Sequence, residues 1–338
     1  MMDTSNLTSV LRKNGYLKGA TVVDIKLCPM ETNGIGSEFY IADLRYSSDH
    51  HSLPNRMVVK QPLVGDRGQG EADVYELVLG SENELPVMGY FGVLDEATEK
   101  PLSLLFEDLS KSHRQTPWPI IPGLSDCERA IETLARVHAH WWGRADAIDA
   151  PTPPVEAHQE PNHLATFFPD FVDFVGEYLS PARIKHYERI FSDLNTLIAH
   201  RLTSDNNTLL HTDPHFWNFL YPKDAQQNEC VIFDWPLWRT GLAGWDLAYM
   251  IGLHLYPEHR HRFEPALLDR YRQVLNEAGV AYDRQDVQLD YRIGLLVGLL
   301  MPVMEFSWKI PPLDWMPKLE KAFAAYEELG CSALFEEI

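Results

Sequence analysis

The chain has 338 residues, of which 45% are hydrophobic and 11% aromatic, a composition that excludes a disordered protein. Its 29 basic and 49 acidic residues give a formal net charge of −20. That charge argues against nucleic acid or an anionic membrane as a partner, and it suits neutral or cationic small ligands. The four cysteines form no CxxC pair, so we expect neither a disulfide framework nor a zinc site, and a cytoplasmic location. A chain of this length is expected to form two lobes or domains.

The first 110 residues have the composition of strands separated by turn formers. Segments rich in β-branched and aromatic side chains predict strands at 20–29, 37–47, 56–62, 86–97 and 102–110. The sequence NGIG at 33–36 predicts a hairpin turn between the first two strands. One helix is predicted at 71–80, where Val74, Leu77 and Val78 recur at helical spacing.

From residue 125 onward, helical periodicity prevails. It predicts helices at 125–143, 181–202, 264–279, 285–309 and 314–329. Ser125 or Asp126 is expected to cap the first of them. The proline-rich segment 150–163 predicts a loop. The apolar run at 293–304 is too short to span a bilayer, and it predicts a buried helix.

Two short apolar strands are predicted inside this helical half, in HTDPHFWNFLYP (211–222) and CVIFDW (230–235). Asp213 and Asn218 lie five residues apart in one loop, a spacing that lets an acid face an acceptor hydroxyl while an amide reaches a metal. Asp234 ends the second strand and could supply the main carboxylate to Mg²⁺, which prefers a few oxygen ligands. These residues therefore indicate phosphoryl transfer, with a buried polar network and a metal hydrolase as alternatives.

The sequence H-T-D-P-H-F-W-N, the strand ending F-D-W and the segment G-L-A-G-W-D-L-A resemble the aminoglycoside phosphotransferase and choline kinase-like superfamily. The family's loop reads H-G-D-x-H-x-x-N, and Thr212 stands here in place of its glycine. The resemblance implies an α+β, two-lobed protein-kinase-like fold that moves the γ-phosphate of ATP, with Mg²⁺, to a hydroxyl of a small molecule. The β-rich nucleotide-binding lobe would be 1–109, ending at the hinge. The helical lobe, 110–338, would contain the catalytic loop (211–220), the metal-binding strand end (231–235) and the substrate-binding helices.

The same resemblance gives each residue of the loop region a role. Asp213 would be the catalytic aspartate, and Asn218 and Asp234 would be the magnesium ligands. Three residues would support the loop: His211, His215 and Asp246. Asp246 could also be a helix N-cap, since it opens the segment GWDLAYMI.

Upstream, the resemblance places Lys60 of MVVK where such kinases keep the lysine that contacts the α- and β-phosphates. Glu71 would be the ion-pair partner of that lysine, with Glu76 as the competing choice. A solvated strand end is the alternative for a lone lysine at this position.

The remaining nucleotide contacts would come from backbone groups. The turn over the phosphates would contain Gly34, Gly36 and Ser37, although a plain hairpin turn has the same letters. The hinge in LLFEDL would bind adenine through backbone groups near Glu107 and Leu109.

Two other functions compete with the kinase interpretation. His211, Asp213 and His215 alternate along the chain as ligands of a metal-dependent hydrolase do. A non-catalytic nucleotide-binding protein is the second alternative. The acceptor, the preference for ATP or GTP and the oligomeric state stay open, and an aminoglycoside, choline-like or sugar-like acceptor is expected.

Overall fold

The computed structural model describes most of the chain. It describes residues 3–30, 36–48, 53–63, 65–76, 85–94, 102–145, 148, 160–226 and 229–336. The predicted loop at 150–159 and the turn residues 33–35 lie outside the described residues.

The chain divides into two compact units. The first contains Met1–Ile120, Asp149–Pro151 and Phe219–Trp238, and the second contains Ile121–Ile148, Thr152–Asn218 and Arg239–Ile338. The first unit is therefore discontinuous in sequence, because one segment joins it more than 200 residues after its start. The expected lobe boundary at residue 109 stays a prediction.

The described part of the first unit contains two helices and a five-stranded antiparallel sheet, followed by three shorter strands. The helices are α1 (Thr4–Lys13) and α2 (Gly65–Val74). The sheet strands are β1 (Val22–Pro29), β2 (Ser37–Tyr46), β3 (Arg56–Pro62), β4 (Tyr90–Leu94) and β5 (Ser103–Glu107), in the order β1-β2-β3-β5-β4. The shorter strands are β6 (His113–Arg114), β8 (Phe219–Pro222) and β9 (Val231–Ile232), and they pair in the order β6-β8-β9.

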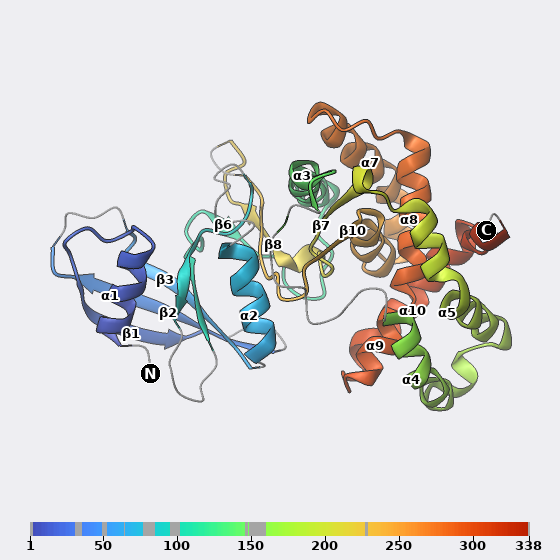
Figure 1. Cartoon of the computed structure of the whole chain (residues 1–338), viewed down its shortest axis with the longest axis horizontal. Coiled ribbons are helices and arrows are strands. Elements are labelled where there is room, and N and C mark those ends of the chain that lie inside the picture. The colour runs from blue at the N-terminus through green and yellow to red at the C-terminus, as the bar shows by residue number, and fades with distance from the viewer. Residues whose placement is uncertain are drawn as a thin grey trace. The chain divides into compact units, whose positions relative to one another are not determined.

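The two faces of the five-stranded sheet contact different helices. Successive side chains of a strand point to opposite faces, so neighbouring residues of β3 contact different helices. Met57 and Val59 of β3 pack into a core with Leu7 and Leu11 of α1. Lys60 therefore points to the other face, where α2 lies (Figure 1). One face packs against α1, and the other presents the charged side chain of Lys60 to Glu71 of α2.

The second unit is mainly helical in its described part. Its helices are α3 (Leu124–Trp141), α4 (Glu160–Val175), α5 (Pro181–Arg201), α6 (Gly244–Leu247), α7 (Pro257–Glu277), α8 (Arg284–Gly298), α9 (Met301–Ser307) and α10 (Pro312–Glu328). Short 3₁₀ turns lie at Gly176–Tyr178, Ser204–Asn206, Phe216–Asn218 and Cys331–Glu336, and a π-helical turn spans Ala248–Leu253. Strands β7 (Asn207–Leu210) and β10 (Arg239–Leu242) form an antiparallel pair.

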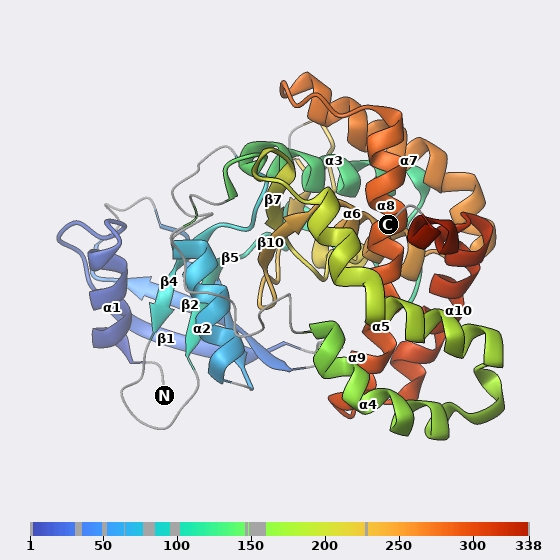
Figure 2. The ribbon, with the colours of Figure 1, turned by 45° about the vertical axis from the view of Figure 1, so that its right-hand side comes forward.

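Helix α8 is the central helix of this unit, among α5, α7 and α10 (Figure 2). Its backbone approaches α6 closely, since a Cβ atom added at Gly244 would lie 1.8 Å from the carbonyl oxygen of Asp290. Within the described residues one helical stretch, Arg284–Ser307, is long and apolar enough to cross a membrane, but 83% of its most apolar window is buried inside the fold. That burial is typical of a core helix.

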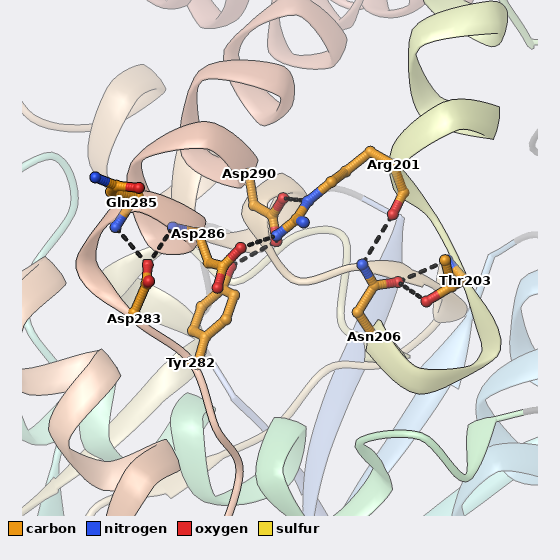
Figure 3. A network of polar contacts seen from close by, with 8 residues as sticks. All are labelled: Arg201, Thr203, Asn206, Tyr282, Asp283, Gln285, Asp286 and Asp290. Atoms are coloured by element: carbon orange, nitrogen blue, oxygen red, sulfur yellow. Dashed lines mark hydrogen bonds and ion pairs between the residues drawn. The ribbon is translucent and has the colours of Figure 1, made fainter.

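A buried polar network ties α8 to the end of α5 (Figure 3). The guanidinium of Arg201 donates to Asp290 at 2.6 Å and to Asp286 at 2.8 Å, and the hydroxyl of Tyr282 donates to Asp290 at 2.6 Å. Burial raises the pKa of Asp290, while the hydrogen bonds from Arg201 and Tyr282 act to lower it. The network therefore fixes α8 against α5 with a compensated charge.

The α+β composition of the fold is confirmed, and strand β3 has the predicted bounds. Several helix predictions are wrong in their bounds. Helix α2 begins at Gly65, six residues before the predicted start, and the predicted helix at 285–309 is two helices, α8 and α9. Pro302 stands in the first turn of α9, where its missing N–H costs nothing.

Three further helix starts also differ from the prediction. Helix α3 begins after Gly123, which makes no side-chain capping bond, so neither Ser125 nor Asp126 is the N-cap. Helix α7 begins at Pro257 rather than at residue 264. Residues 160–163, predicted as loop, open α4, and α1 was not predicted.

Candidate active site

A buried ion cluster lies on the α2 face of the first unit. Lys60 is 4% exposed, and its Nζ donates to Glu71 Oε2 of α2 and, at 2.5 Å, to Asp234 Oδ1. Burial acts to lower the pKa of Lys60, but the charges of Asp234 and Glu71 outweigh it and hold that pKa above its ordinary value. Lys60 is therefore a permanent buried cation, not a solvated strand end.

Glu71, and not Glu76, is the partner of this lysine. Glu71 is 1% exposed, and its Oε1 accepts from the backbone N–H of Trp235 at 3.2 Å. Glu76 is exposed, and its carboxylate accepts from the hydroxyl of Tyr90 at 3.2 Å. Burial raises the pKa of Glu71, with Lys60 acting in the opposite direction.

Asp234 follows β9 in a left-handed backbone conformation, with φ of 70°. Strand β9 is fixed to the segment before β4, because Ile232 donates to Pro86 O at 3.0 Å and accepts from Met88 N at 3.2 Å. The left-handed turn costs energy for a residue with a Cβ, although aspartate tolerates it better than most. The turn brings the carboxylate to Lys60 while the side chain stays 31% exposed.

The predicted catalytic loop belongs to the second unit as far as Asn218 and is held by Asp246. This aspartate is fully buried in α6 and accepts from His211 N at 2.7 Å and from Thr212 N at 2.8 Å. His138 Nε2 of α3 lies 3.2 Å from the same carboxylate. Thr212 has φ of 69°, a left-handed conformation that the glycine of the resembling family adopts without strain. Asp246 therefore fixes the strained turn rather than capping a helix.

The side chains of the loop are arranged around Asp213. Asn218 Nδ2 donates to the backbone oxygen of Asp213 at 2.9 Å, which directs the amide oxygen of Asn218 away from that carbonyl. His211 Nδ1 accepts from Asp213 N at 3.3 Å, and His215 Nε2 lies 3.7 Å from Asp213 Oδ2. Both histidines thus contact the aspartate or its backbone.

Other residues near Asp213 come from distant helices, and of these Tyr249 was not foreseen in the sequence. The buried hydroxyl of Tyr249, in the π-helical turn, forms a hydrogen bond with Asp213, and burial is the main cause of its strongly raised pKa. Glu305 of α9 is 8% exposed and contacts Lys318 Nζ of α10. Burial raises the pKa of Glu305, Lys318 opposes the rise, and Asp213 adds to it. Glu305 is therefore within electrostatic range of the loop.

Three aromatic side chains, His215, Trp217 and His254, also pack together at the loop. The His254 ring lies 5.5 Å from His215 and 5.8 Å from Trp217, measured between ring centroids. Burial, followed by the charges of His215 and Lys318, holds the pKa of His254 well below its ordinary value. His254 is therefore neutral at pH 7.

The residues present suit Mg²⁺ better than a hydrolase metal. Asp234 in the first unit and Asn218 in the second each offer an oxygen of the kind that Mg²⁺ takes beside nucleotide phosphates, from a carboxylate and an amide respectively. Among the described residues, no group of three or more histidine, cysteine, aspartate or glutamate side chains is placed to hold a metal ion. The alternating His211, Asp213 and His215 thus do not form such a group.

The expected nucleotide turn and hinge are described in part. Gly34 lies outside the described residues, Gly36 has φ of 98° and accepts from Leu63 N at 2.8 Å, and Ser37 opens β2. Glu107 N donates to Gly89 O at 2.8 Å inside the sheet, and Leu109 O accepts from His113 N at 2.9 Å. Their contacts with a nucleotide stay a prediction.

Comparisons with known proteins agree with this description. The family model of the ecdysteroid kinase-like family matches residues 90–280. A choline kinase from Cryptosporidium parvum has a similar structure, with a TM-score of 0.58 and 13% identity over 99% of this chain and 97% of its own. A Ralstonia eutropha protein described as an aminoglycoside phosphotransferase has the same score and identity over 99% of both chains. A macrolide 2′-phosphotransferase from Brachybacterium faecium has a TM-score of 0.53 and 14% identity over 94% of this chain and 97% of its own.

These structures confirm the two-lobed, protein-kinase-like fold, and the family model together with them confirms the superfamily resemblance. No curated protein matches the chain in sequence.

Proposed function

Because the chain belongs to the ecdysteroid kinase-like family, we propose that it transfers the γ-phosphoryl group of ATP to a hydroxyl group of a small molecule. The contact of Lys60 with both Glu71 and Asp234 carries this proposal. A structural ion pair would be complete with one carboxylate. The second, partly exposed carboxylate of Asp234 makes the cluster suitable for nucleotide phosphates and a metal ion.

On the nucleotide side, Lys60 binds phosphate oxygens while Glu71 holds its ammonium group in place. Asp234 and Asn218 would be the ligands of Mg²⁺, which would supply charge neutralisation for the transferred phosphoryl group. The strained turn at Asp234 sets the direction of its carboxylate before any ligand binds.

On the acceptor side, Asp213 accepts a hydrogen bond from the attacking hydroxyl and orients its oxygen toward the γ-phosphorus. The new P–O bond forms to that oxygen, the hydroxyl proton passes to the carboxylate of Asp213, the bond to the β–γ bridging oxygen breaks, and ADP leaves. Tyr249 and Asp246 keep the loop in position, Tyr249 through the carboxylate of Asp213 and Asp246 through the backbone of the loop. Asp213 supplies positioning and charge, which account for most of the rate in this chemistry.

We further propose that the acceptor is a neutral hydroxylated molecule with an apolar body. The acidic Glu305 near the loop is already compensated by Lys318, and His254 is uncharged, so this surface offers little surplus negative charge to a polycation. In the same unit, apolar side chains of α4 and α9 pack together, with the rings of Phe174 and Phe306 5.4 Å apart and Phe174 58% exposed. Trp315, in contrast, is fully buried and belongs to the core.

A nucleotide-binding experiment tests the function first. The melting temperature should rise with ATP or GTP only when Mg²⁺ is present, and Asp234→Asn should abolish the rise. Screening polyhydroxylated terpenoids, choline and aminoglycosides for acceptor-dependent ADP release then identifies the acceptor class.

We place this activity in a reducing cytoplasm, with which the four free thiols are compatible.

The non-catalytic alternative gives a different result in the same experiment. A protein that only binds nucleotide would show the Mg²⁺-dependent rise but no ADP release with any acceptor. Folded protein that shows no rise with either nucleotide would contradict the proposed function.

A further inference from the structure

A cavity lies in the first unit, on the face of the sheet opposite to the buried ion cluster. It has a volume of about 430 Å³, and its lining includes Tyr16, Leu53, Phe91 and Glu107. Glu107 is paired with Met57, which packs under α1. The cavity therefore lies on the α1 face of the sheet, opposite to the face that carries Lys60. Its volume is within the range of small-molecule sites.

Two aromatic rings form one wall and are held in place by hydrogen bonds to the backbone of β4. The rings of Tyr16 and Phe91 meet edge to face, with centroids 5.2 Å apart and planes at 80°. The hydroxyl of Tyr16 donates to Tyr90 O at 2.9 Å, and Asn14 Nδ2 donates to Phe91 O at 2.9 Å. The wall is therefore preorganised, which lowers the entropic cost of binding a ligand.

The carboxylate of Glu107 lies over Gly89, which also lines the cavity. A Cβ atom added at Gly89 would lie 2.9 Å from Glu107 Oε2, so the missing side chain makes the room for this carboxylate. Arg56, which precedes Met57 in β3, is engaged by Asp108, with Nε 3.0 Å from Oδ2. Within the part of the chain that the structure describes, no basic side chain forms an ion pair with Glu107.

We propose that this cavity binds a small organic cation that carries an aromatic or aliphatic body. The ammonium group binds the Glu107 carboxylate, and the body packs on Tyr16 and Phe91, since aromatic ring faces attract cations and apolar groups. A carboxylate beside fixed aromatic rings is the usual recognition surface for such ligands. The net charge of −20 also favours the approach of cations. The expected hinge contact involves the backbone near Glu107, whereas this site uses the Glu107 side chain on the α1 face of the sheet, so the site does not depend on the proposed phosphoryl transfer.

Isothermal titration of the full chain with benzyltrimethylammonium tests the site, with benzyl alcohol as the uncharged probe. The cation should bind at one saturable site, and benzyl alcohol should bind at least roughly tenfold more weakly. Glu107→Gln should weaken the cation by roughly tenfold or more, because it removes the charge and keeps the shape. Gly89→Ala should weaken it too, since the new Cβ displaces the carboxylate without changing its charge.

Two control variants separate this site from other acidic groups. Glu38→Gln changes an exposed glutamate of β2 that accepts from Tyr40, and it should leave the affinity unchanged. Asp213→Asn should also leave it unchanged, because that residue belongs to the second unit. Absence of saturable binding, equal affinity in Glu107→Gln, or loss of binding in Asp213→Asn would overturn the proposal. None of these results bears on nucleotide binding, so the two proposals are tested independently.

Discussion

Replacing Lys60 by methionine tests the central claim that this lysine is a buried, doubly compensated cation. The substitution keeps the apolar stem and removes the charge between Glu71 and Asp234. Glu71 is 1% exposed and would be left as a buried carboxylate without its cation. Removing one partner of a buried ion pair costs about 3–5 kcal/mol, and we expect a loss of that size at neutral pH.

A second substitution identifies the origin of this loss. Glu71→Gln in the Lys60→Met background removes the uncompensated buried charge and keeps an acceptor for Trp235 N. We therefore expect the double variant to recover roughly 2 kcal/mol relative to Lys60→Met alone. Asp234 adds less to the loss, because its side chain is 31% exposed and water screens its charge.

The effect of pH follows from the direction of the Glu71 pKa. Burial raises this pKa in the folded state, and Lys60 opposes the rise, so the substitution raises it further. A carboxyl group whose pKa is higher in the folded than in the unfolded state favours folding below its ordinary pKa. That contribution is lost as the pH rises through the folded-state pKa. The destabilisation by Lys60→Met should therefore be smaller at pH 5 than at pH 8.

Because the chain has two units, global unfolding need not be two-state, and hydrogen exchange of the β2, β3 and β5 amides in urea is the better measurement. A Lys60→Met variant within 1 kcal/mol of wild type, or a double variant no more stable than the single one, would refute the reasoning.

Three further perturbations report on the second unit. Gly244→Ala should destabilise it by about 1–3 kcal/mol or more in urea unfolding, because the new Cβ would lie 1.8 Å from a backbone oxygen of α8. Gly123→Ala, which meets nothing within 4 Å, should change stability little. Burial lowers the pKa of Lys321 to about 8, so more of its amine is uncharged at pH 8 than that of an exposed lysine. Acetic anhydride at pH 8 should therefore acylate Lys321 well ahead of exposed lysines, as measured by mass spectrometry. Equal acylation rates would contradict this. Tyr249→Phe removes the hydrogen bond to Asp213 and should lower kcat roughly tenfold with little change in the KM for ATP. A change in the KM for ATP alone would count against that role of Tyr249.

Local sequence signals were sufficient for elements whose stability is local in origin. Strand β3 is a short β-branched run between turn formers, and its bounds follow directly. Helix α2 instead begins in GDRGQG, where three glycines disfavour a helix. Its buried residues Glu71, Ala72 and Val74 show that tertiary packing overrides this propensity. A propensity argument could not include that packing.

Some residues of the candidate site could likewise be predicted from local sequence, and others could not. Motif spacing brought attention to Asp213, Asn218 and Asp234, because their roles depend on positions within one loop and one strand end. The contribution of Tyr249 depends on how the π-helical turn packs, and no local pattern indicates it. The left-handed turn at Thr212 was also hidden, since a β-branched residue rarely adopts it.

The discontinuous make-up of the first unit has a consequence for its folding during synthesis. Strands β1 to β5 are complete by Glu107, but β8, β9 and Asp234 belong to the same unit and are made more than a hundred residues later. At ribosomal rates of about 5–20 residues per second, that delay is on the order of ten seconds. During this time Lys60 and Glu71 are without their third partner, so a nascent N-terminal fragment should remain protease-sensitive until Trp238 has left the ribosome.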